Sequence, residues 1–403
     1  MSAATSHIGA QERQLPMPLF RLGFRPFFLL GAIWAVLGLA LWLAALAGLA
    51  EVGGPYGAVA WHAHEMIYGF AAAVLAGFLL TAVPGWTMQP KLGPVGLAGL
   101  AAIWIAGRFA MAGAGTIGPA AAAMIDLLFL ALLFGWTAAQ IVAGRNWRNL
   151  PVAFGPAILL VSNLMFHLEA LGVTEATQQP SYRLGIAIYV LLVAMIGGRI
   201  VPAFTRNWLS KQGLGGSMPV LPTRFDMAVI LLTVVALGTW VAAPDHVLVA
   251  ATALPAAVGH VVRLLRWRGW RTLSEPLLWI LHLAYLWVPA GLLLVACAAL
   301  HPDRVPASAA LHALTAGVIG TMMLAMMTRA TLGHTGRPLS ADPATTATYL
   351  LVIGSAVLRV AAPFFGDVYM MLVTGSGLLW VAGFLVYLIA YAPKLWGEPV
   401  RIS

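Results

Sequence analysis

Long apolar runs separated by short polar turns occupy almost the whole chain. About 20 apolar residues in a helix are enough to cross the hydrocarbon core of a bilayer. Proline, glycine and polar residues end the runs, and no intervening loop is long enough to hold a soluble domain. The pattern predicts an all-α polytopic membrane protein with a bundle of twelve transmembrane helices, at residues 27–50, 62–84, 92–113, 118–142, 151–172, 182–206, 225–243, 246–266, 274–300, 308–330, 343–364 and 367–392.

Composition supports this prediction and narrows the classes of function. Hydrophobic residues make up 61% of the chain and charged residues 9%, whereas soluble domains usually contain about 25% charged residues. The net charge of +9 does not indicate a nucleic-acid partner, because the basic residues lie between apolar runs. The single cysteine, Cys297, excludes intrachain disulfides, iron–sulfur clusters and covalently attached c-type haem.

Basic residues alternate between the two sides of the predicted bundle. Lysine and arginine concentrate in cytoplasmic loops, so we expect both termini in the cytoplasm. Segment 1–26, which lacks the features of a signal peptide, and the tail 393–403 would then flank a membrane domain at 27–392. The predicted cytoplasmic side carries Arg13, Arg21, Arg25, Lys91, Arg145, Arg148, Arg206, Lys211, Arg224, Arg263, Arg266, Arg268, Arg271, Arg329, Arg337, Lys394 and Arg401. The opposite loops hold Glu51, Glu175, Arg183, Asp245, Asp303, Arg304 and Asp367.

Ionisable residues inside the predicted helices gather toward the outer side of the membrane. Such groups are costly at membrane depth and usually mark a functional site that faces the interior of a bundle. At about 1.5 Å of rise per helical residue, eight of them fall in the outer half, on six helices. They are His62, His64, Glu65, Arg108, Asp126, His167, His312 and Arg359.

The stretch Trp61-His62-Ala63-His64-Glu65-Met66 opens the second predicted helix. Neutral histidine is a common metal ligand and often holds haem iron. Because the two histidines are two positions apart, a regular helix directs them about 200° apart. Either the first turn is irregular, or one histidine binds a metal while the other faces a different group. The alternative is a pair of interfacial histidines that reach the headgroup region.

Arg108 and Arg359 have two interpretations. Each is able to pair with Asp126 or to cap a helix end, and each is also suited to bidentate contacts with the propionates of a haem. Asp126 is the expected partner of an arginine, or a proton relay, because a lone buried carboxylate tends to become neutral.

The inner half contains Arg199 and two histidines, His260 and His282, and a third histidine, His334, lies just beyond the tenth predicted helix. Each histidine alone is most simply a satisfied polar side chain. Together they would form a second metal site, for which copper is a candidate because imidazole suits copper as well as iron. A loose repeat also links two helices, since a glycine follows His64 and His312 by five residues in each case.

Several motifs resemble the NnrS family, in the same order along the chain. They are Leu22-Gly23-Phe24-Arg25-Pro26-Phe27-Phe28, Trp61–Met66, Gly77–Ala82, Gly107-Arg108, Leu281-His282 with Tyr285, His312–Thr315, Met326–Arg329 and Leu332–Pro338. The resemblance covers essentially the whole chain. It implies a bacterial inner-membrane protein that contains haem and copper and is linked to nitric oxide metabolism, in denitrification or in relief of nitrosative stress.

Depth and resemblance together lead us to expect haem b in the outer half of the bundle. His64 and His312, at matched depth, are the first ligand candidates, and His62 is the next. Arg108 and Arg359 would hold the propionates. Among the other histidines, His167 is a further candidate metal ligand.

The expected chemistry is reduction of nitric oxide to nitrous oxide, with Glu65 and Asp126 handling protons. Nitric oxide is small, apolar and membrane-soluble, so it is able to reach a buried iron through lipid. Electrons would come from quinol or a separate redox protein, because the chain has no soluble redox domain. One alternative is a sensor or scavenger that binds nitric oxide or a metal without turnover, and the other is a secondary transporter.

Overall fold

The computed structural model describes residues 17–400, so Arg13 and Arg401 of the predicted cytoplasmic set lie outside the described residues. Within this part, twelve helical segments are long and apolar enough to cross a membrane, as predicted, and there is no strand. The protein is therefore a multi-pass membrane protein. Nine spans are single helices: α2 (Phe24–Leu46), α5 (Pro94–Ala112), α7 (Pro119–Ala143), α8 (Leu150–Ala170), α11 (Arg224–Ala242), α12 (Val247–Arg266), α13 (Pro276–Leu300), α16 (Pro343–Ala361) and α17 (Tyr369–Trp396).

The other three spans each combine two α-helices with a π-helical segment between them. Span 2 consists of α3 (Ala58–His64), η4 (Glu65–Ala71) and α4 (Ala72–Thr87). Span 6 consists of α9 (Gln178–Leu192), η6 (Val193–Gly197) and α10 (Gly198–Lys211). Span 10 consists of α14 (Ala307–His312), η8 (Ala313–Gly320) and α15 (Thr321–His334).

Helix ends follow ordinary capping chemistry. Proline occupies the first turn of α5, α7, α13 and α16, where its missing N–H costs nothing. Span 2 begins at Ala58, one turn before the predicted limit. Gly57, which precedes it, takes a positive φ of 75° that a helix does not continue through, so the helix begins directly after this glycine. His62 and His64 therefore lie inside the helix rather than at its first turn.

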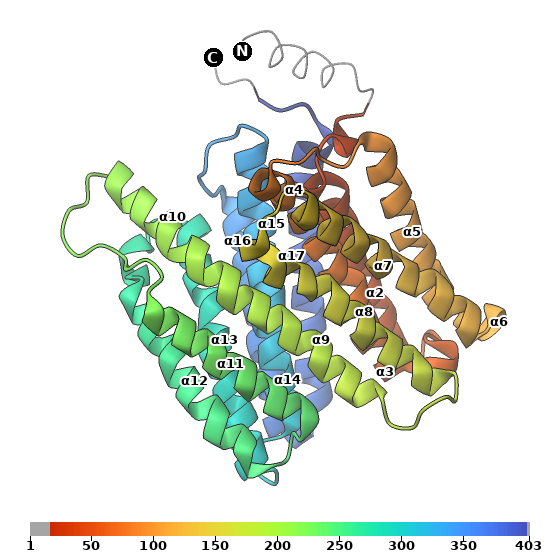
Figure 1. The fold of residues 1–403 in the computed structure, drawn as a ribbon. Helices are drawn as coiled ribbons and strands as arrows, with labels where there is room; N and C mark the ends of the chain where they lie inside the picture. The colour runs from red at the N-terminus through yellow and green to blue at the C-terminus, as the bar shows by residue number, and fades with distance from the viewer. Residues whose placement is uncertain (1–16, 401–403) are drawn as a thin grey trace.

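The three π-containing spans form the centre of the bundle. Their most apolar windows are 78%, 61% and 67% buried for spans 2, 6 and 10, whereas the other nine lie between 33% and 50%. Figure 1 shows α9 and α10 running obliquely across the bundle, with α11 and α12 on one side and α7 and α8 on the other. The remaining spans surround the central ones and face lipid with their outer sides.

Each π-segment carries backbone carbonyls that bond to side chains. The Tyr189 hydroxyl donates to the Ile67 carbonyl at 3.0 Å, and Trp104 Nε1 donates to the Gly69 carbonyl at 3.1 Å. Arg263 Nη1 donates to the Ala194 carbonyl in η6 at 3.2 Å. In η8, the Thr321 hydroxyl donates to the Gly317 carbonyl. Hydrocarbon cannot satisfy these groups, so the donors make the π-geometry possible at membrane depth.

The weak repeat in the sequence corresponds to a shared local structure. A π-segment begins directly after His64 and directly after His312, and the matching residues Gly69 and Gly317 lie within the two segments. π-segments are rare in proteins, and those that occur are often at functional sites.

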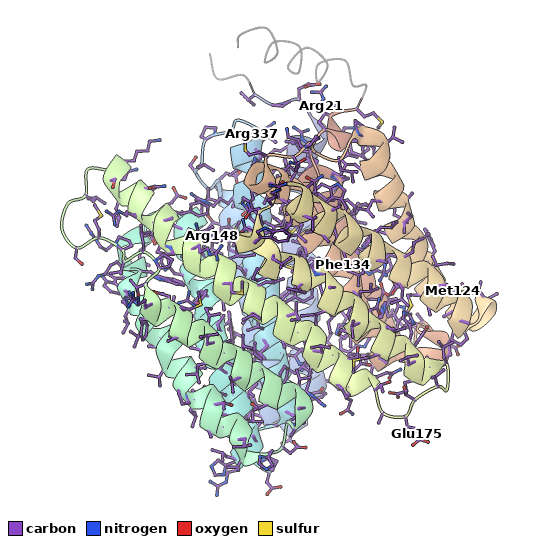
Figure 2. All side chains as sticks on the ribbon, in the orientation of Figure 1. Arg21, Met124, Phe134, Arg148, Glu175 and Arg337 are labelled. Atoms are coloured by element: carbon purple, nitrogen blue, oxygen red, sulfur yellow. The ribbon has the colours of Figure 1, made fainter. Side chains whose placement is uncertain are left out.

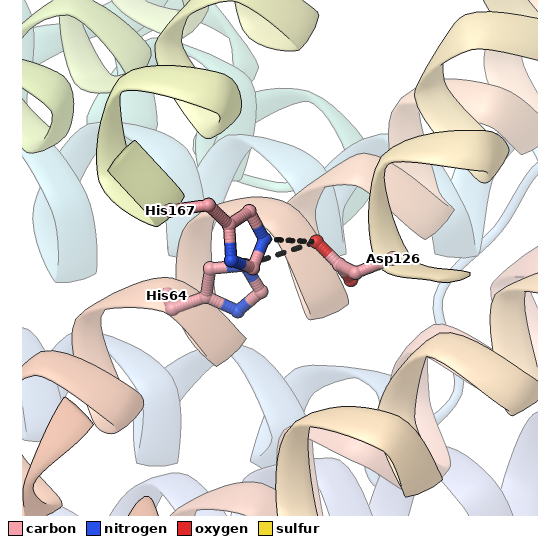
Figure 3. A group of neighbouring side chains, drawn as sticks. All are labelled: His64, Asp126 and His167. Atoms are coloured by element: carbon pink, nitrogen blue, oxygen red, sulfur yellow. Dashed lines mark hydrogen bonds and ion pairs between the residues drawn. The ribbon is translucent and has the colours of Figure 1, made fainter. Parts of the chain in front are cut away.

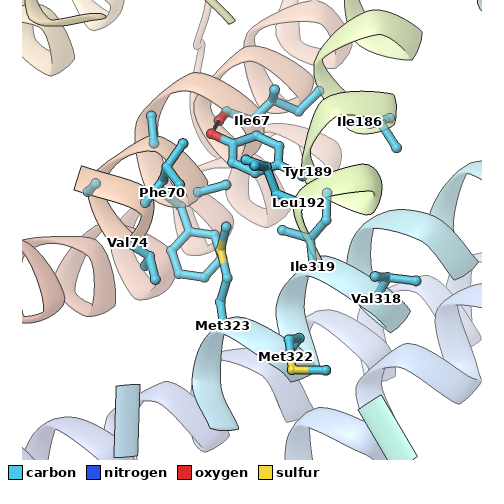
Figure 4. Packing of buried hydrophobic residues seen from close by; sticks show 14 of the residues in the cluster. Ile67, Phe70, Val74, Ile186, Tyr189, Leu192, Val318, Ile319, Met322 and Met323 are labelled. Carbon is cyan, nitrogen blue, oxygen red and sulfur yellow. Dashed lines mark hydrogen bonds between the residues drawn. The ribbon is translucent and has the colours of Figure 1, made fainter. Parts of the chain in front are cut away.

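The central spans meet through apolar side chains. Figure 4 shows Ile67 and Phe70 of span 2, Tyr189 of span 6, and Ile319 and Met323 of span 10 gathered in one layer. Tyr189 and Met323 also line a small apolar cavity of about 90 Å³, whose other walls are largely aliphatic and methionine side chains. The methionines here belong to the packed centre, where their flexible side chains fill irregular gaps.

Both described ends of the chain lie at one end of the bundle. Arg25 is 1% exposed and donates to the carbonyls of Leu395 at 3.0 Å and Gly397 at 2.7 Å. Beside it, Arg21 pairs with Glu398 at 2.5 Å. Figure 2 shows Arg21 at this end and Glu175 at the other. We call the end away from the termini the distal end; it is the one that the charge pattern predicts to be outer.

Replacing Arg25 with alanine should lower the free energy of unfolding by about 3–6 kcal/mol, because it removes two hydrogen bonds from a charged group and each contributes about 1.5–3 kcal/mol. The Arg21→Ala variant removes a more exposed pair and should lose less than about 1 kcal/mol. Thermal unfolding of the purified protein in detergent measures both. Equal losses from the two variants would contradict a dominant role for Arg25.

Candidate functional site

Span 2 divides the ionisable residues of the distal end into two groups. On one side, His64, Glu65, Arg108, Asp126 and His167, together with Asn163, form a buried group that we call the distal cluster. On the other side, His62, His312 and Arg359 line an open space that we call the distal cavity.

Ion pairs hold one half of the distal cluster together. The Arg108 guanidinium donates through Nη1 to Glu65 Oε2 at 2.6 Å and through Nη2 to Asp126 Oδ1. These three side chains come from spans 2, 3 and 4 and belong to residues that are at most 4% exposed. Gly69 makes room for them, since a Cβ there would lie 2.7 Å from Arg108 Nη1. The pairing of Arg108 with Asp126 is the first of the two interpretations that the sequence allowed.

Two histidines and an asparagine complete the cluster around the other oxygen of Asp126. Asp126 Oδ2 lies 3.1 Å from His64 Nε2 and 3.2 Å from His167 Nε2, and it accepts from Asn163 Nδ2 at 2.6 Å. Figure 3 shows both imidazoles directed at this carboxylate from different helices. His64 Nδ1 contacts Glu65 Oε1 at 2.9 Å, and His167 Nδ1 contacts the Tyr56 hydroxyl at 2.9 Å.

The distal cavity has a volume of about 400 Å³ and is mostly apolar. His312 Nδ1 lies 2.7 Å from the Ser308 carbonyl, one turn earlier on span 10. The His62 ring stacks on Trp42, with ring centroids 4.1 Å apart and planes at 19°. His62 Nδ1 and Arg359 Nη1 are buried and have no hydrogen-bond partner. The cavity is therefore a space with unused polar atoms in its walls.

The structure separates the two histidines that the depth argument ranked first. His312 lines the distal cavity with His62, whereas His64 faces the distal cluster. His62 and His64 point to different sides of span 2, as their spacing requires. Glu65 and Asp126 are likewise absent from the cavity wall.

The inner histidines do not share one site. His260 contacts Thr233 and Tyr285 at 2.9 Å each, and His282 contacts Thr205 at 2.8 Å. The ring of His334 lies 5.5 Å from that of Phe24. In the described part of the chain, His64, Asp126 and His167 are the one group of three or more potential ligands close enough to hold a metal ion.

Sequence reasoning missed three residues that complete these networks. Asn163 lies one turn before His167 in a mostly apolar helix, and this spacing places the two side chains on the same face. Tyr56 lies in a loop segment, η3 (Gly54–Tyr56), whose fold brings it over His167. Toward the end of the bundle that carries the chain termini, Arg263 Nε lies 3.0 Å from Asp226 Oδ1. Nothing in the linear sequence indicates this pairing.

A family model described as NnrS protein matches residues 18–398, nearly the whole chain. The chain belongs to the NnrS family. No curated protein and no solved structure matches it.

The motifs that resemble the NnrS family lie at both parts of the distal site. Trp61–Met66 supplies His62 to the cavity and both His64 and Glu65 to the cluster. In the Gly107-Arg108 motif, Gly107 lets Asp126 approach, since a Cβ there would lie 3.2 Å from Asp126 Oδ1. His312 and Thr315 of the His312–Thr315 motif line the cavity.

Replacing Arg108 with methionine should destabilise the protein by about 3–5 kcal/mol, because it leaves two buried carboxylates without their cation. Adding Glu65→Gln to that variant should restore part of the loss. Arg359→Met is the matched control, because no carboxylate depends on Arg359. Denaturant or thermal unfolding in detergent measures all three, and a similar loss in the two single variants would argue against the ion-pair account.

Proposed function

We propose that this protein binds haem b in the distal cavity, within the bacterial inner membrane, and uses it to bind and reduce nitric oxide. The observation that carries the proposal is the wall of the cavity, where His312, His62 and Arg359 face an apolar space of about 400 Å³. His62 Nδ1 and Arg359 Nη1 have no hydrogen-bond partner there. Cofactor sites of this kind usually occupy about 300–1,000 Å³.

His312 would be a ligand to the haem iron. Its contact with the Ser308 carbonyl requires the proton on Nδ1, because a carbonyl only accepts. The lone pair of the ring is then on Nε2. Histidines that bind metals commonly donate their other N–H to a carbonyl or carboxylate in this way, which sets the tautomer and the orientation of the ring.

His62 and Arg359 provide the other polar contacts of the proposed site. His62 is oriented by stacking on Trp42, and its Nδ1 has no protein partner. Arg359 offers an unpaired Nη1 at the same cavity. Because guanidinium forms strong bidentate contacts with carboxylates, Arg359 fits a haem propionate, whereas Arg108 is already occupied by Glu65 and Asp126.

The proposed reaction converts two nitric oxide molecules, two electrons and two protons into nitrous oxide and water. Haem iron would supply the binding position for nitric oxide and the route for electrons. The electrons would come from quinol or an external redox protein. Glu65 and Asp126 lie on the other side of span 2 from the cavity, so the proposal does not route the protons through them.

The purified protein should show a b-type optical spectrum that shifts when nitric oxide is added to the reduced form. His312→Ala and Arg359→Ala should lower the haem content, His312→Ala most strongly, because each removes a proposed contact. His260→Ala, which changes a buried histidine far from the cavity, should retain haem. Protein made with ample haem that shows no Soret band would overturn the haem proposal and favour a transporter.

The reduced protein with an electron donor should produce nitrous oxide from nitric oxide, which gas chromatography detects. His62→Ala should reduce this rate by at least about tenfold, because contacts around a metal centre commonly change activity by about 10–100-fold. A stable nitrosyl spectrum without nitrous oxide would contradict turnover and favour a protein that senses or scavenges nitric oxide.

A further inference from the structure

The surroundings of His64 contain too many oxygen acceptors for a neutral imidazole. Its Nδ1 faces the Glu65 carboxylate at 2.9 Å, and its Nε2 faces both Asp126 Oδ2 at 3.1 Å and Asn163 Oδ1 at 2.9 Å. The Asn163 amide cannot turn its NH₂ group toward His64 instead, because Asn163 Nδ2 already donates to Asp126 Oδ2 at 2.6 Å. A neutral ring has one N–H only, so a positive charge is needed where Nε2 meets these oxygens.

A count of buried charge gives the same result. Glu65 and Asp126 contribute two negative charges, and Arg108 contributes one positive charge. All three residues are at most 4% exposed. The sum is one negative charge, and an unbalanced charge at membrane depth is costly, so the cluster favours a further cation. A proton on His64 would bring the sum to zero and a divalent ion would bring it to +1, so the count calls for a cation without selecting between the two. The spacing of the donor atoms favours the metal ion.

We propose that the distal cluster binds a divalent first-row transition-metal ion through His64 Nε2, His167 Nε2 and Asp126 Oδ2, with Asn163 Oδ1 as a fourth donor. The three principal donor atoms all lie within 4.8 Å of one another. Neighbouring donors are 2.9–3.2 Å apart. Ligands about 2.1 Å from a metal would be separated by about 3.0–3.4 Å, so the donors already have nearly the required spacing.

Each principal ligand also makes a second contact, on the side away from the proposed metal, that orients its side chain. Glu65 accepts from His64 Nδ1, the Tyr56 hydroxyl contacts His167 Nδ1, and Arg108 binds the remaining oxygen of Asp126. Such outer contacts fix the tautomer and orientation of metal ligands. This arrangement explains why both histidines present Nε2 to one carboxylate oxygen.

The donor set indicates the class of metal. Two imidazoles with oxygen donors suit zinc, copper or ferrous iron better than magnesium or calcium, which prefer oxygen alone. None of the four donors lines the distal cavity. The proposed metal site is therefore separate from the proposed haem site and does not rest on it.

Metal content measures this proposal directly. The full-length protein is purified in detergent, incubated separately with Zn²⁺, Cu²⁺ and anaerobic Fe²⁺, desalted, and analysed by mass spectrometry, with haem iron subtracted. We expect about one retained ion per chain with at least one of the three metals. His167→Gln and Asp126→Asn should weaken binding of that metal by about tenfold or more, whereas His260→Gln and His312→Gln should not change it.

X-ray absorption at the edge of the retained metal provides a test that does not depend on the folding of any variant. The wild-type protein should show nitrogen and oxygen ligands at about 2.0–2.1 Å with imidazole scattering. Failure to retain any of the three metals, or equal retention by His167→Gln, Asp126→Asn and the wild type, would overturn the proposal. A proton on His64 would then be the cation that balances the cluster. Sulfur ligands in the absorption spectrum would also overturn it.

Discussion

Hydrocarbon offers no partner to a polar group, so most such groups that this chain buries at membrane depth find one inside the protein. The exceptions include His62 Nδ1 and Arg359 Nη1 at the distal cavity. The central spans show how strongly this constraint acts. Their π-segments expose carbonyls that are bonded by Tyr189, Trp104 and Arg263 from neighbouring spans. Each bond joins two helices at a defined height, so satisfying the polar groups also sets the register in which the helices pack.

The same constraint produces charged networks at both ends of the bundle. At the distal end, Arg108 joins Glu65 and Asp126 from two other spans. At the terminal end, Arg263 joins Asp226 to the backbone of η6 and fits in the space left by Gly198. Both arginines lie against aromatic rings as well, Arg108 against Trp104 and Arg263 against Trp267. In each network the guanidinium is the shared donor that fastens an outer helix to a central one.

Span 2 gives the distal end two chemically different compartments. The distal cluster is closely bonded, and its acceptors outnumber its donors. The distal cavity is open, mostly apolar, and has nitrogen atoms without partners. We propose a metal ion for the first compartment and haem for the second. Because one short motif, Trp61–Met66, supplies residues to both, a change at a single position of this helix affects one compartment while leaving the side chains of the other in place.

The sequence by itself determined the membrane class, the twelve spans and the depth at which ionisable residues gather. These features depend on hydrophobicity and on the rise of a helix, which are local properties of the chain. It also placed His62 and His64 on different faces, since that follows from helical geometry. Only the tertiary structure decided which faces meet: that His62 shares a cavity with His312, and that His64 meets Asp126 and His167. Those contacts depend on the rotation of each helix in the bundle, on the unforeseen π-segments and on polar partners such as Asn163 and Tyr56. Long-range packing determines all three. These helices are apolar on most sides, so their sequence hardly indicates which side faces which neighbour.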